Sequence, residues 1–248
     1  MIKLINVLRG IVEGINIIDN QYVVDYDKDY SEDLIKFSDK ITFKKNDDGD
    51  TVIIGIPVEK YNTKSKLIND LKNLRNIDPN VVSFIMSKIV DNLDNQVDIN
   101  SFDYIISPKS SSPLLKTFLD KLKSKTDKPI YVSDMFLKND ADNIWLDLDK
   151  AKDELSNKYY KKLIKDFEKI KNVGGRALKL QPLTKFQRKY IKDLLIVNSD
   201  YENMLVDMLD KKVLVVDDIF TTGKTLNDIK TILSKLNING VTLFGMFG

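Results

Sequence analysis

The sequence predicts an α/β protein built on an open, mainly parallel sheet with flanking helices. Strand, helix and strand follow one another closely over residues 102–132, and the same order returns over residues 213–247. Short strands joined by helices are typical of parallel sheets with right-handed crossovers. A third observation, β-type sequence before residue 60, adds an antiparallel element to this prediction.

The first sixty residues carry the antiparallel prediction. Three segments are rich in β-branched and aromatic residues: 21–27 (QYVVDYD), 40–45 (KITFKK) and 51–57 (TVIIGIP). The turn-forming run NDDGD at 46–50 predicts a hairpin between the last two. We therefore assign residues 1–60 to an N-terminal β-rich hood and residues 61–248 to the core.

Apolar residues at helical spacing predict the helices of the core. This spacing occurs in four segments: 63–74, 78–93, 113–125 and 225–236. Four short apolar segments predict the strands of the core: 102–107, 129–132, 213–216 and 241–247. The order of these segments gives one elaborated α/β domain.

A long insert separates the two α/β units. About seventy residues lack a clear strand, far more than an ordinary connection contains. Residues 147–172 predict one charged amphipathic helix, which the run VGGR at 173–176 breaks, and residues 181–197 follow. We interpret residues 138–200 as a helical lid insert.

The composition excludes several kinds of chemistry. The 248 residues include no cysteine and no histidine, which removes disulfides, thiolate nucleophiles and histidine bases. A metal ion would need oxygen ligands, which favours magnesium, calcium or manganese. The apolar runs are too short to span a bilayer, and residues 1–20 lack a signal-peptide pattern. We therefore expect a soluble cytoplasmic protein without a membrane partner.

Residues 213–225 (VLVVDDIFTTGKT) end in a Gly-Lys-Thr like that of a nucleotide-binding P-loop. A P-loop needs a glycine five positions before its Gly-Lys, so that bare backbone can wrap the phosphates. Asp218 occupies that position relative to Gly223. Its carboxylate and its restricted backbone exclude the P-loop interpretation.

The same segment has the composition of a sugar-phosphate site. Asp217 and Asp218 follow a predicted strand, where open parallel sheets bind ligands, and the next turn leads into a helix N-terminus that attracts anions. Five residues form this turn and helix start: Thr221, Thr222, Gly223, Lys224 and Thr225. Carboxylates accept hydrogen bonds from vicinal hydroxyls or from a hydrated cation, so a ribose 5-phosphate fits both halves. The alternative is an ordinary strand–turn–helix with a capping threonine.

Residues 213–226 (VLVVDDIFTTGKTL) resemble the phosphoribosyl-diphosphate signature of type I phosphoribosyltransferases: a hydrophobic strand, two acids, then Thr-Thr-Gly-x-Thr. The resemblance implies that Asp217 and Asp218 contact the ribose hydroxyls and that the following turn holds the 5-phosphate. It also implies a magnesium ion, which we assign to the same two carboxylates. The implied fold is the open α/β sheet of this family.

Two further elements of the family have counterparts in the chain. Residues 105–114 (IISPKSSSPL) resemble its diphosphate loop, although such clusters are often plain loops. The loop would use the charge of Lys109 and the hydroxyls and amides of three serines: Ser110, Ser111 and Ser112.

The family's mobile lid corresponds to the insert, where four candidates lie: Arg176, Lys179, Gln181 and Arg188. The ComF-like, competence-associated branch of the family is loosely similar here, through Gln181, Leu183 and Arg188, although the spacing is one residue short. The alternative is that these residues are surface cations and polar groups on a solvated helix.

The sequence thus predicts a magnesium-dependent phosphoribosyltransferase that acts on a nucleobase or related nitrogen nucleophile and releases diphosphate. Catalysis is assigned to four residues: Asp217, Asp218, Lys109 and Arg188. Arg176 joins the serine loop and the Thr221–Thr225 turn in substrate binding. The acceptor is not identified; Phe244 and Phe247 either stack on a base or, as we favour, pack in the core. We also expect a homo-oligomer.

Other functions are compatible with parts of the sequence. A binding module could keep the site without turnover and act as a sensor of phosphoribosyl diphosphate. A diphosphokinase would need an ATP site, for which the sequence offers no candidate. Nucleic-acid binding could use the basic–aromatic stretches KYYKKLIK (158–165) and KFQRKY (185–190). Interleaved acids and a formal charge of only +2 favour solvated helix faces there.

Overall fold

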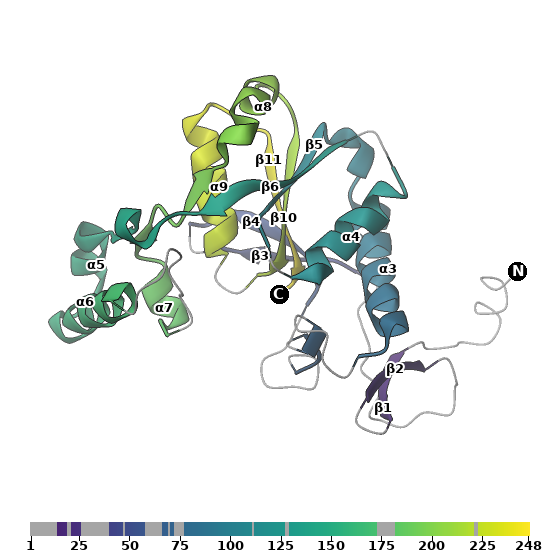
Figure 1. Ribbon diagram of the computed structural model, residues 1–248, viewed down its shortest axis with the longest axis horizontal. Coiled ribbons are helices and arrows are strands. Elements are labelled where there is room, and N and C mark those ends of the chain that lie inside the picture. The colour runs from purple at the N-terminus through teal and green to yellow at the C-terminus, as the bar shows by residue number, and fades with distance from the viewer. Residues whose placement is uncertain are drawn as a thin grey trace, which may run out of the picture.

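The protein has a seven-stranded sheet covered by helices on both faces, with a helical lobe projecting from one side (Figure 1). The computed structural model describes residues 14–18, 21–25, 40–46, 48–57, 66–68, 70–71, 77–110, 112–126, 129–172, 182–220 and 223–248. The predicted α/β class with a mainly parallel sheet and flanking helices is confirmed. None of the helices within the described ranges is long and apolar enough to span a bilayer.

The strand order of the main sheet is β3-β4-β11-β10-β5-β6-β9. The five central strands run parallel: β4 (Thr51–Ile56), β11 (Val241–Phe247), β10 (Val213–Ile219), β5 (Tyr104–Pro108) and β6 (Ile130–Lys138). The two edge strands are antiparallel: β3 (Thr42–Lys45) against β4, and β9 (Leu195–Val197) against β6. All four predicted core strands are present.

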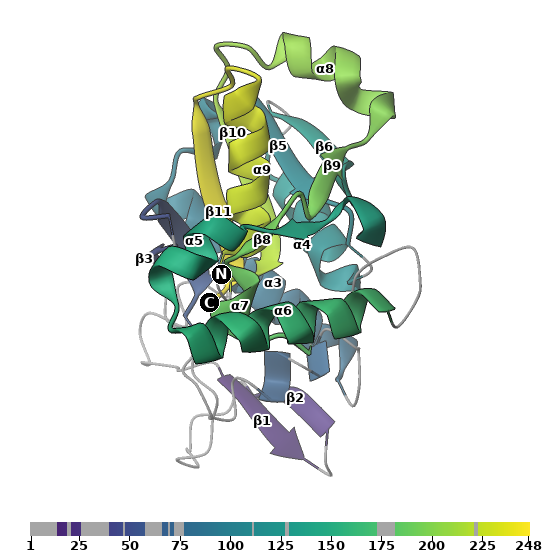
Figure 2. The ribbon, with the colours of Figure 1, turned by 90° about the vertical axis from the view of Figure 1, so that its left-hand side faces the viewer.

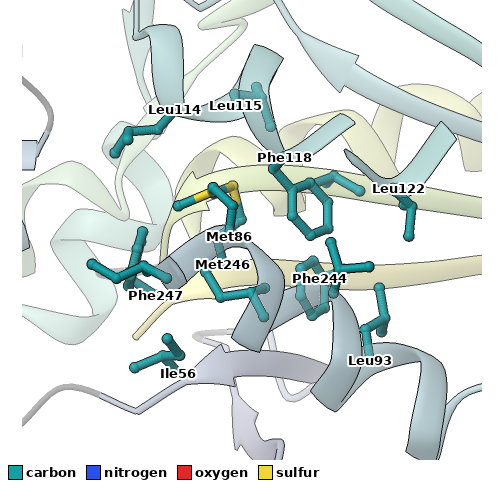
Figure 3. Close-up of a cluster of buried hydrophobic side chains, with 14 of the residues drawn as sticks. Ile56, Met86, Leu93, Leu114, Leu115, Phe118, Leu122, Phe244, Met246 and Phe247 are labelled. Atoms are coloured by element: carbon teal, nitrogen blue, oxygen red, sulfur yellow. The ribbon is translucent and has the colours of Figure 1, made fainter. Parts of the chain in front are cut away.

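One face of the sheet packs against α3 (Pro79–Gln96) and α4 (Pro113–Lys123). Side chains from both helices pack there against side chains from four strands of the sheet, β4, β5, β10 and β11. The rings of Phe118 and Phe244 stack with centroids 5.6 Å apart (Figure 3). Phe244 and Phe247 are fully buried, so core packing is confirmed for both. We call this side the α3/α4 face.

The opposite face packs against α9 (Lys224–Lys235), which inserts Leu226, Ile229 and Leu233. Residues of β10 alternate between the two faces: Val213 and Val215 point to α9, whereas Leu214 and Val216 point to α3 and α4. α8 (Glu202–Asp207) also contributes to this side, which we call the α9 face. Among the described residues, three short 3₁₀ helices occur in the connections: Ile99–Ser101, Ala141–Asn143 and Ser199–Tyr201.

Residues 42–56 correct the predicted division of the chain. The hairpin between β3 and β4 forms as expected, with Gly49 at φ +85° in its turn. However, β4 pairs in parallel with β11, so both strands belong to the main sheet and not to a separate hood. Among the described residues before position 60, β1 (Gly14–Ile18) and β2 (Gln21–Asp25) form a separate two-stranded sheet, which lies beside the start of α3.

The insert is a small lobe with its own strands. It contains α5 (Leu148–Glu154), α6 (Asn157–Asn172), α7 (Lys185–Arg188) and a short ladder between β7 (Trp145–Leu146) and β8 (Ile191–Lys192). The expected single helix over 147–172 is wrong: α5 ends at Glu154, and α6 begins after Ser156, whose carbonyl accepts the amide of Tyr160. The lobe lies at the height of the C-terminus in both views (Figures 1 and 2).

Candidate functional site

The connections of the sheet reverse direction between β5 and β10, which are neighbours. From β5 the chain crosses the α3/α4 face through α4 to β6, whereas from β10 it crosses the α9 face through α9 to β11 on the other side. In open α/β sheets, ligands bind beyond the carboxyl ends of the strands at such a switch point. The serine loop and the Asp-Asp-Thr-Thr-Gly segment lie at these two strand ends.

Asp217 and Asp218 lie within the last three residues of β10. The strand was expected to end at Val216 but continues to Ile219, because Asp217 pairs with Gly245 and Ile219 with Phe247 in β11. Asp217 is half-buried, and Asp218 is 8% exposed. The Asp217 carboxylate accepts the backbone N–H of Asp218 at 2.9 Å, which orients it along the strand end.

The turn after β10 is packed tightly where the structure describes it. Thr221 and Thr222 lie outside the described residues. Gly223 adopts φ +72°, and a Cβ at this position would lie 2.6 Å from Cε2 of Phe220 and 3.1 Å from Cβ of Asn46. Glycine is therefore required both by its backbone angle and by its neighbours. Thr225 is half-buried in the first turn of α9.

Lys224 pairs with Asp228 one turn further along α9. Both side chains are largely buried, with exposed fractions of 16% and 13%. Burial raises the pKa of Asp228 from 3.8 to about 6, although Lys224 opposes this, and the nearby carboxylates of Asp193 and Asp48 add to the rise. The expected phosphate ligand Lys224 is thus held by a carboxylate of its own helix. Oδ2 of Asp228 has no hydrogen-bond partner among the described residues.

The turn of the β3–β4 hairpin fastens to α9 beside this site. The buried amides of Asn46 and Asn227 bond to each other, and Asn227 donates to Asp48 at 2.8 Å. Lys230 forms an ion pair with Asp50. The Asn46 side-chain oxygen also accepts the amides of Asp48 and Asp50, at 3.1 and 2.7 Å. The turn is predictable from local sequence but this contact is not, because nothing in the sequence relates residues 181 positions apart.

The start of the loop after β5 is positioned by a shift in the pairing register between β5 and β6. A bulge in β6, where Asp134 has φ 63°, shifts the register so that Phe136 lies opposite Pro108 of β5. The Phe136 carbonyl then accepts the amide of Lys109 at 2.9 Å. Bulges next to sites commonly re-aim the neighbouring backbone. Here the bulge fixes the start of the predicted diphosphate loop.

The side chains of this loop are available to a ligand. Lys109 and Ser110 are exposed, and Ser110 Oγ accepts the amide of Ser112 at 3.0 Å. Ser112 is the N-cap of α4, with its Oγ 3.4 Å from the amide of Leu114; Ser111 lies outside the described residues. Ser107, which sequence analysis did not select, is 1% exposed, and its Oγ has no hydrogen-bond partner among the described residues.

The predicted lid residues are only partly described. Arg176, Lys179 and Gln181 lie outside the described residues. Arg188 ends α7 in the insert, where its Nε donates to the carbonyl of Leu183 at 3.0 Å. The contact that is described for Arg188 therefore holds it within the lobe. Closure of this side chain onto the serine loop remains a prediction.

The carboxylates of the site suit a magnesium ion that binds together with a phosphorylated ligand. Within the described ranges, no three acidic side chains come together to hold a metal. Asp217 and Asp218 are the two carboxylates at this strand end. Magnesium commonly uses one or two protein carboxylates and completes its shell with water and substrate phosphates. Asp217, the more exposed of the two, fits that arrangement best.

No protein-family model matches the chain, and no curated protein is significantly similar to it in sequence. The function is therefore inferred from the residues of this chain and from their placement.

Proposed function

We propose that the protein is a type I phosphoribosyltransferase-like enzyme that transfers a 5-phosphoribosyl group from phosphoribosyl diphosphate to a nitrogen nucleophile. The observation that carries this proposal is the position of the two predicted loops at neighbouring strand ends of the switch point. The last paired residues of β5 and β10 are Ile106 and Val215. Pro108 and Asp217 each follow two residues later, so the serine loop and the acidic strand end lie side by side.

The polarity of the ligand matches this arrangement. The 5-phosphate would bind the turn at the N-terminus of α9, where free amides and the helix dipole favour an anion. The ribose hydroxyls would donate to Asp217 and Asp218, and the diphosphate would reach Lys109, Ser110 and the N-terminus of α4. A single sugar diphosphate can thus span both strands of the switch point.

The chemistry then consists mainly of positioning and charge neutralisation. The bond from the anomeric carbon to the diphosphate oxygen breaks, and a bond from that carbon to the acceptor nitrogen forms. The nitrogen loses its proton to the departing diphosphate or to the half-buried Asp217. Diphosphate leaves readily when its charge is neutralised, and bound magnesium supplies that charge together with Lys109.

A sensor of phosphoribosyl diphosphate is the second candidate. Lys224, the charged residue of the 5-phosphate turn, pairs with Asp228, and Arg188 contacts its own lobe. A site with fewer cations on the ligand would stabilise the leaving diphosphate less, yet could still bind the intact molecule. Turnover distinguishes the two functions.

Phosphorus NMR provides this test. The protein is mixed with phosphoribosyl diphosphate, magnesium and a pool of nucleobases and amines. We expect diphosphate release that depends on the pool and is abolished by Asp217→Asn/Asp218→Asn. The exposed Asp120→Asn on α4 serves as a control with the same chemical change. Perturbed ligand signals without release would support the sensor, and unperturbed signals would contradict both functions.

A further inference from the structure

The outer face of α6 is uniformly basic. Successive residues of an α-helix are rotated by about 100°, so positions can be assigned to faces of the helix. Five lysines lie within an arc of about 100° opposite the buried side: Lys158, Lys161, Lys162, Lys165 and Lys169. The two acids of the helix, Asp166 and Glu168, fall outside this arc. The lysines extend over about 16 Å of helix.

The apolar side of α6 is already in use. Leu163 and Phe167 are buried, and Gln187 of α7 donates to Asp166 at 2.8 Å along the edge of the helix. A helix that lies on a membrane needs a free apolar face. Because that face is packed inside the lobe, α6 offers a surface of charge and not an amphipathic anchor.

Most lysines of this face are not held by a carboxylate, unlike some lysines elsewhere in the described chain. Lys125 next to α4 pairs with Asp91, and Lys230 on α9 pairs with Asp50. Across the described part of the chain, no ion pair is found for Lys158, Lys161 or Lys165. The helix has six lysines and two acids, a formal charge of +4, while the whole chain has +2. The rest of the molecule is therefore slightly acidic, and its positive charge is concentrated on this helix.

We propose that the outer face of α6 binds the phosphate backbone of single-stranded nucleic acid. Lys162 pairs with Asp166, and the other four lysines form a row that complements a strand with one phosphate per nucleotide. Tyr159 borders the row and is 61% exposed, so it is placed to stack on a base. From sequence alone, the neighbouring acids Asp166 and Glu168 favour a solvated helix face. The fold instead moves Asp166 to the packed edge, where Lys162 and Gln187 contact it.

Fluorescence anisotropy with labelled dT20 and U20 tests this proposal in the absence of phosphoribosyl diphosphate. Lys158→Gln/Lys165→Gln should weaken binding about tenfold or more at low salt. Four contacting lysines predict a slope of log K against log salt of about −3, and the double variant should reduce it to about −1.4. Comparison of the two strands shows whether DNA or RNA is preferred.

Two controls make the test specific. Lys116→Gln/Lys123→Gln removes the same charge from exposed positions on α4, on the other face of the sheet, and should leave binding unchanged. Tyr159→Ala should weaken binding about fivefold or more if the ring stacks on a base. An equal loss in the α4 variant, or no binding by the unchanged protein at low salt, would overturn the proposal. Displacement of dT20 by polyglutamate of equal charge would also overturn it, in favour of an acidic protein partner.

Discussion

Among single residues, two glycines with positive φ allow the effect of backbone strain to be distinguished from that of steric crowding. Gly223 and Gly49 have φ +72° and +85°, but only Gly223 has neighbours where a Cβ would be placed. Gly223→Ala should lower affinity for phosphoribosyl diphosphate at least tenfold, because the turn must move away from Phe220. Gly49→Ala carries similar strain, about 1 kcal/mol, and should leave affinity unchanged. Isothermal titration calorimetry of both variants checks this, and equal affinities would contradict it.

Asp228 should give the protein a pH-dependent stability. Burial raises its pKa to about 6, so the folded state holds the proton more tightly than the unfolded chain does. The contribution of this proton to the free energy of unfolding is fully present below about pH 4. It is lost as pH rises through about 6, and the loss is roughly 3 kcal/mol. Asp228→Asn removes the titration, so its stability relative to the unchanged protein should rise between pH 4.5 and 7.5.

Urea unfolding of both proteins across this range measures the difference. Asp50, Asp147 and Asp166 have pKa values lowered below 3.8 by lysine partners and hydrogen bonds, so their contributions change mainly below the range tested. These groups are also common to both proteins and cancel in the comparison. A stability difference that does not vary with pH would show that Asp228 does not titrate there.

At the scale of secondary-structure elements, the β3–β4 turn should stabilise α9 through Asn227. Asn227→Ala would leave the buried amide of Asn46 without a partner on α9 and would remove the bond to Asp48. We expect a loss of about 2 kcal/mol in the free energy of unfolding, since a buried polar group then goes unpaired. Asn239→Ala, at an exposed position, should change it by less than about 0.5 kcal/mol. Equal effects in urea unfolding would argue against the role of this contact.

The elements also show what local sequence can predict. Helices α3, α4 and α9 were found because apolar residues recur at helical spacing and the helices are long. Strands β7, β8 and β9 were missed because they have two or three residues each and depend on pairing with distant partners. The hairpin at 42–56 was recognised because its turn is local. Its place beside β11 was not, because it depends on a distant partner. Local propensity specifies an element, whereas tertiary contact decides which sheet it joins.

At the scale of the whole molecule, the helical lobe is attached at two adjacent positions. The amide of Asn139 donates to the carbonyl of Leu194 at 2.9 Å, so the chain leaves and re-enters the sheet at one place. Replacing residues 140–193 with Asn-Gly should join β6 to β9 as a hairpin. The shortened protein should fold and bind phosphoribosyl diphosphate, but diphosphate release should be lost if the lobe acts as a lid.

Circular dichroism and phosphorus NMR on the shortened protein provide the measurements. Retained release would contradict the assignment of the lobe as a lid, and it would leave the proposed ligand site intact. Loss of folding would show that the lobe is part of the core. The outcome bears on Arg188 as well, since this candidate belongs to the replaced segment.

The candidate site was predictable in its parts but not in its environment. The acidic strand end and the serine loop could be found because each is a short contiguous motif. The Asn46 contact, the buried pair of Lys224 with Asp228 and the bulge at Asp134 all depend on distant or buried neighbours. These features determine how the turn is held and how its charge is balanced.

Calorimetric titration of the protein with phosphoribosyl diphosphate and magnesium tests the proposed ligand site directly. Asp217→Asn/Asp218→Asn and Asp120→Asn are titrated in parallel. We expect saturable binding to the unchanged protein and to Asp120→Asn, and a loss of at least tenfold in affinity for the double variant. Binding that is absent from all three proteins, or equal in all three, would contradict a phosphoribosyl diphosphate site at the end of β10.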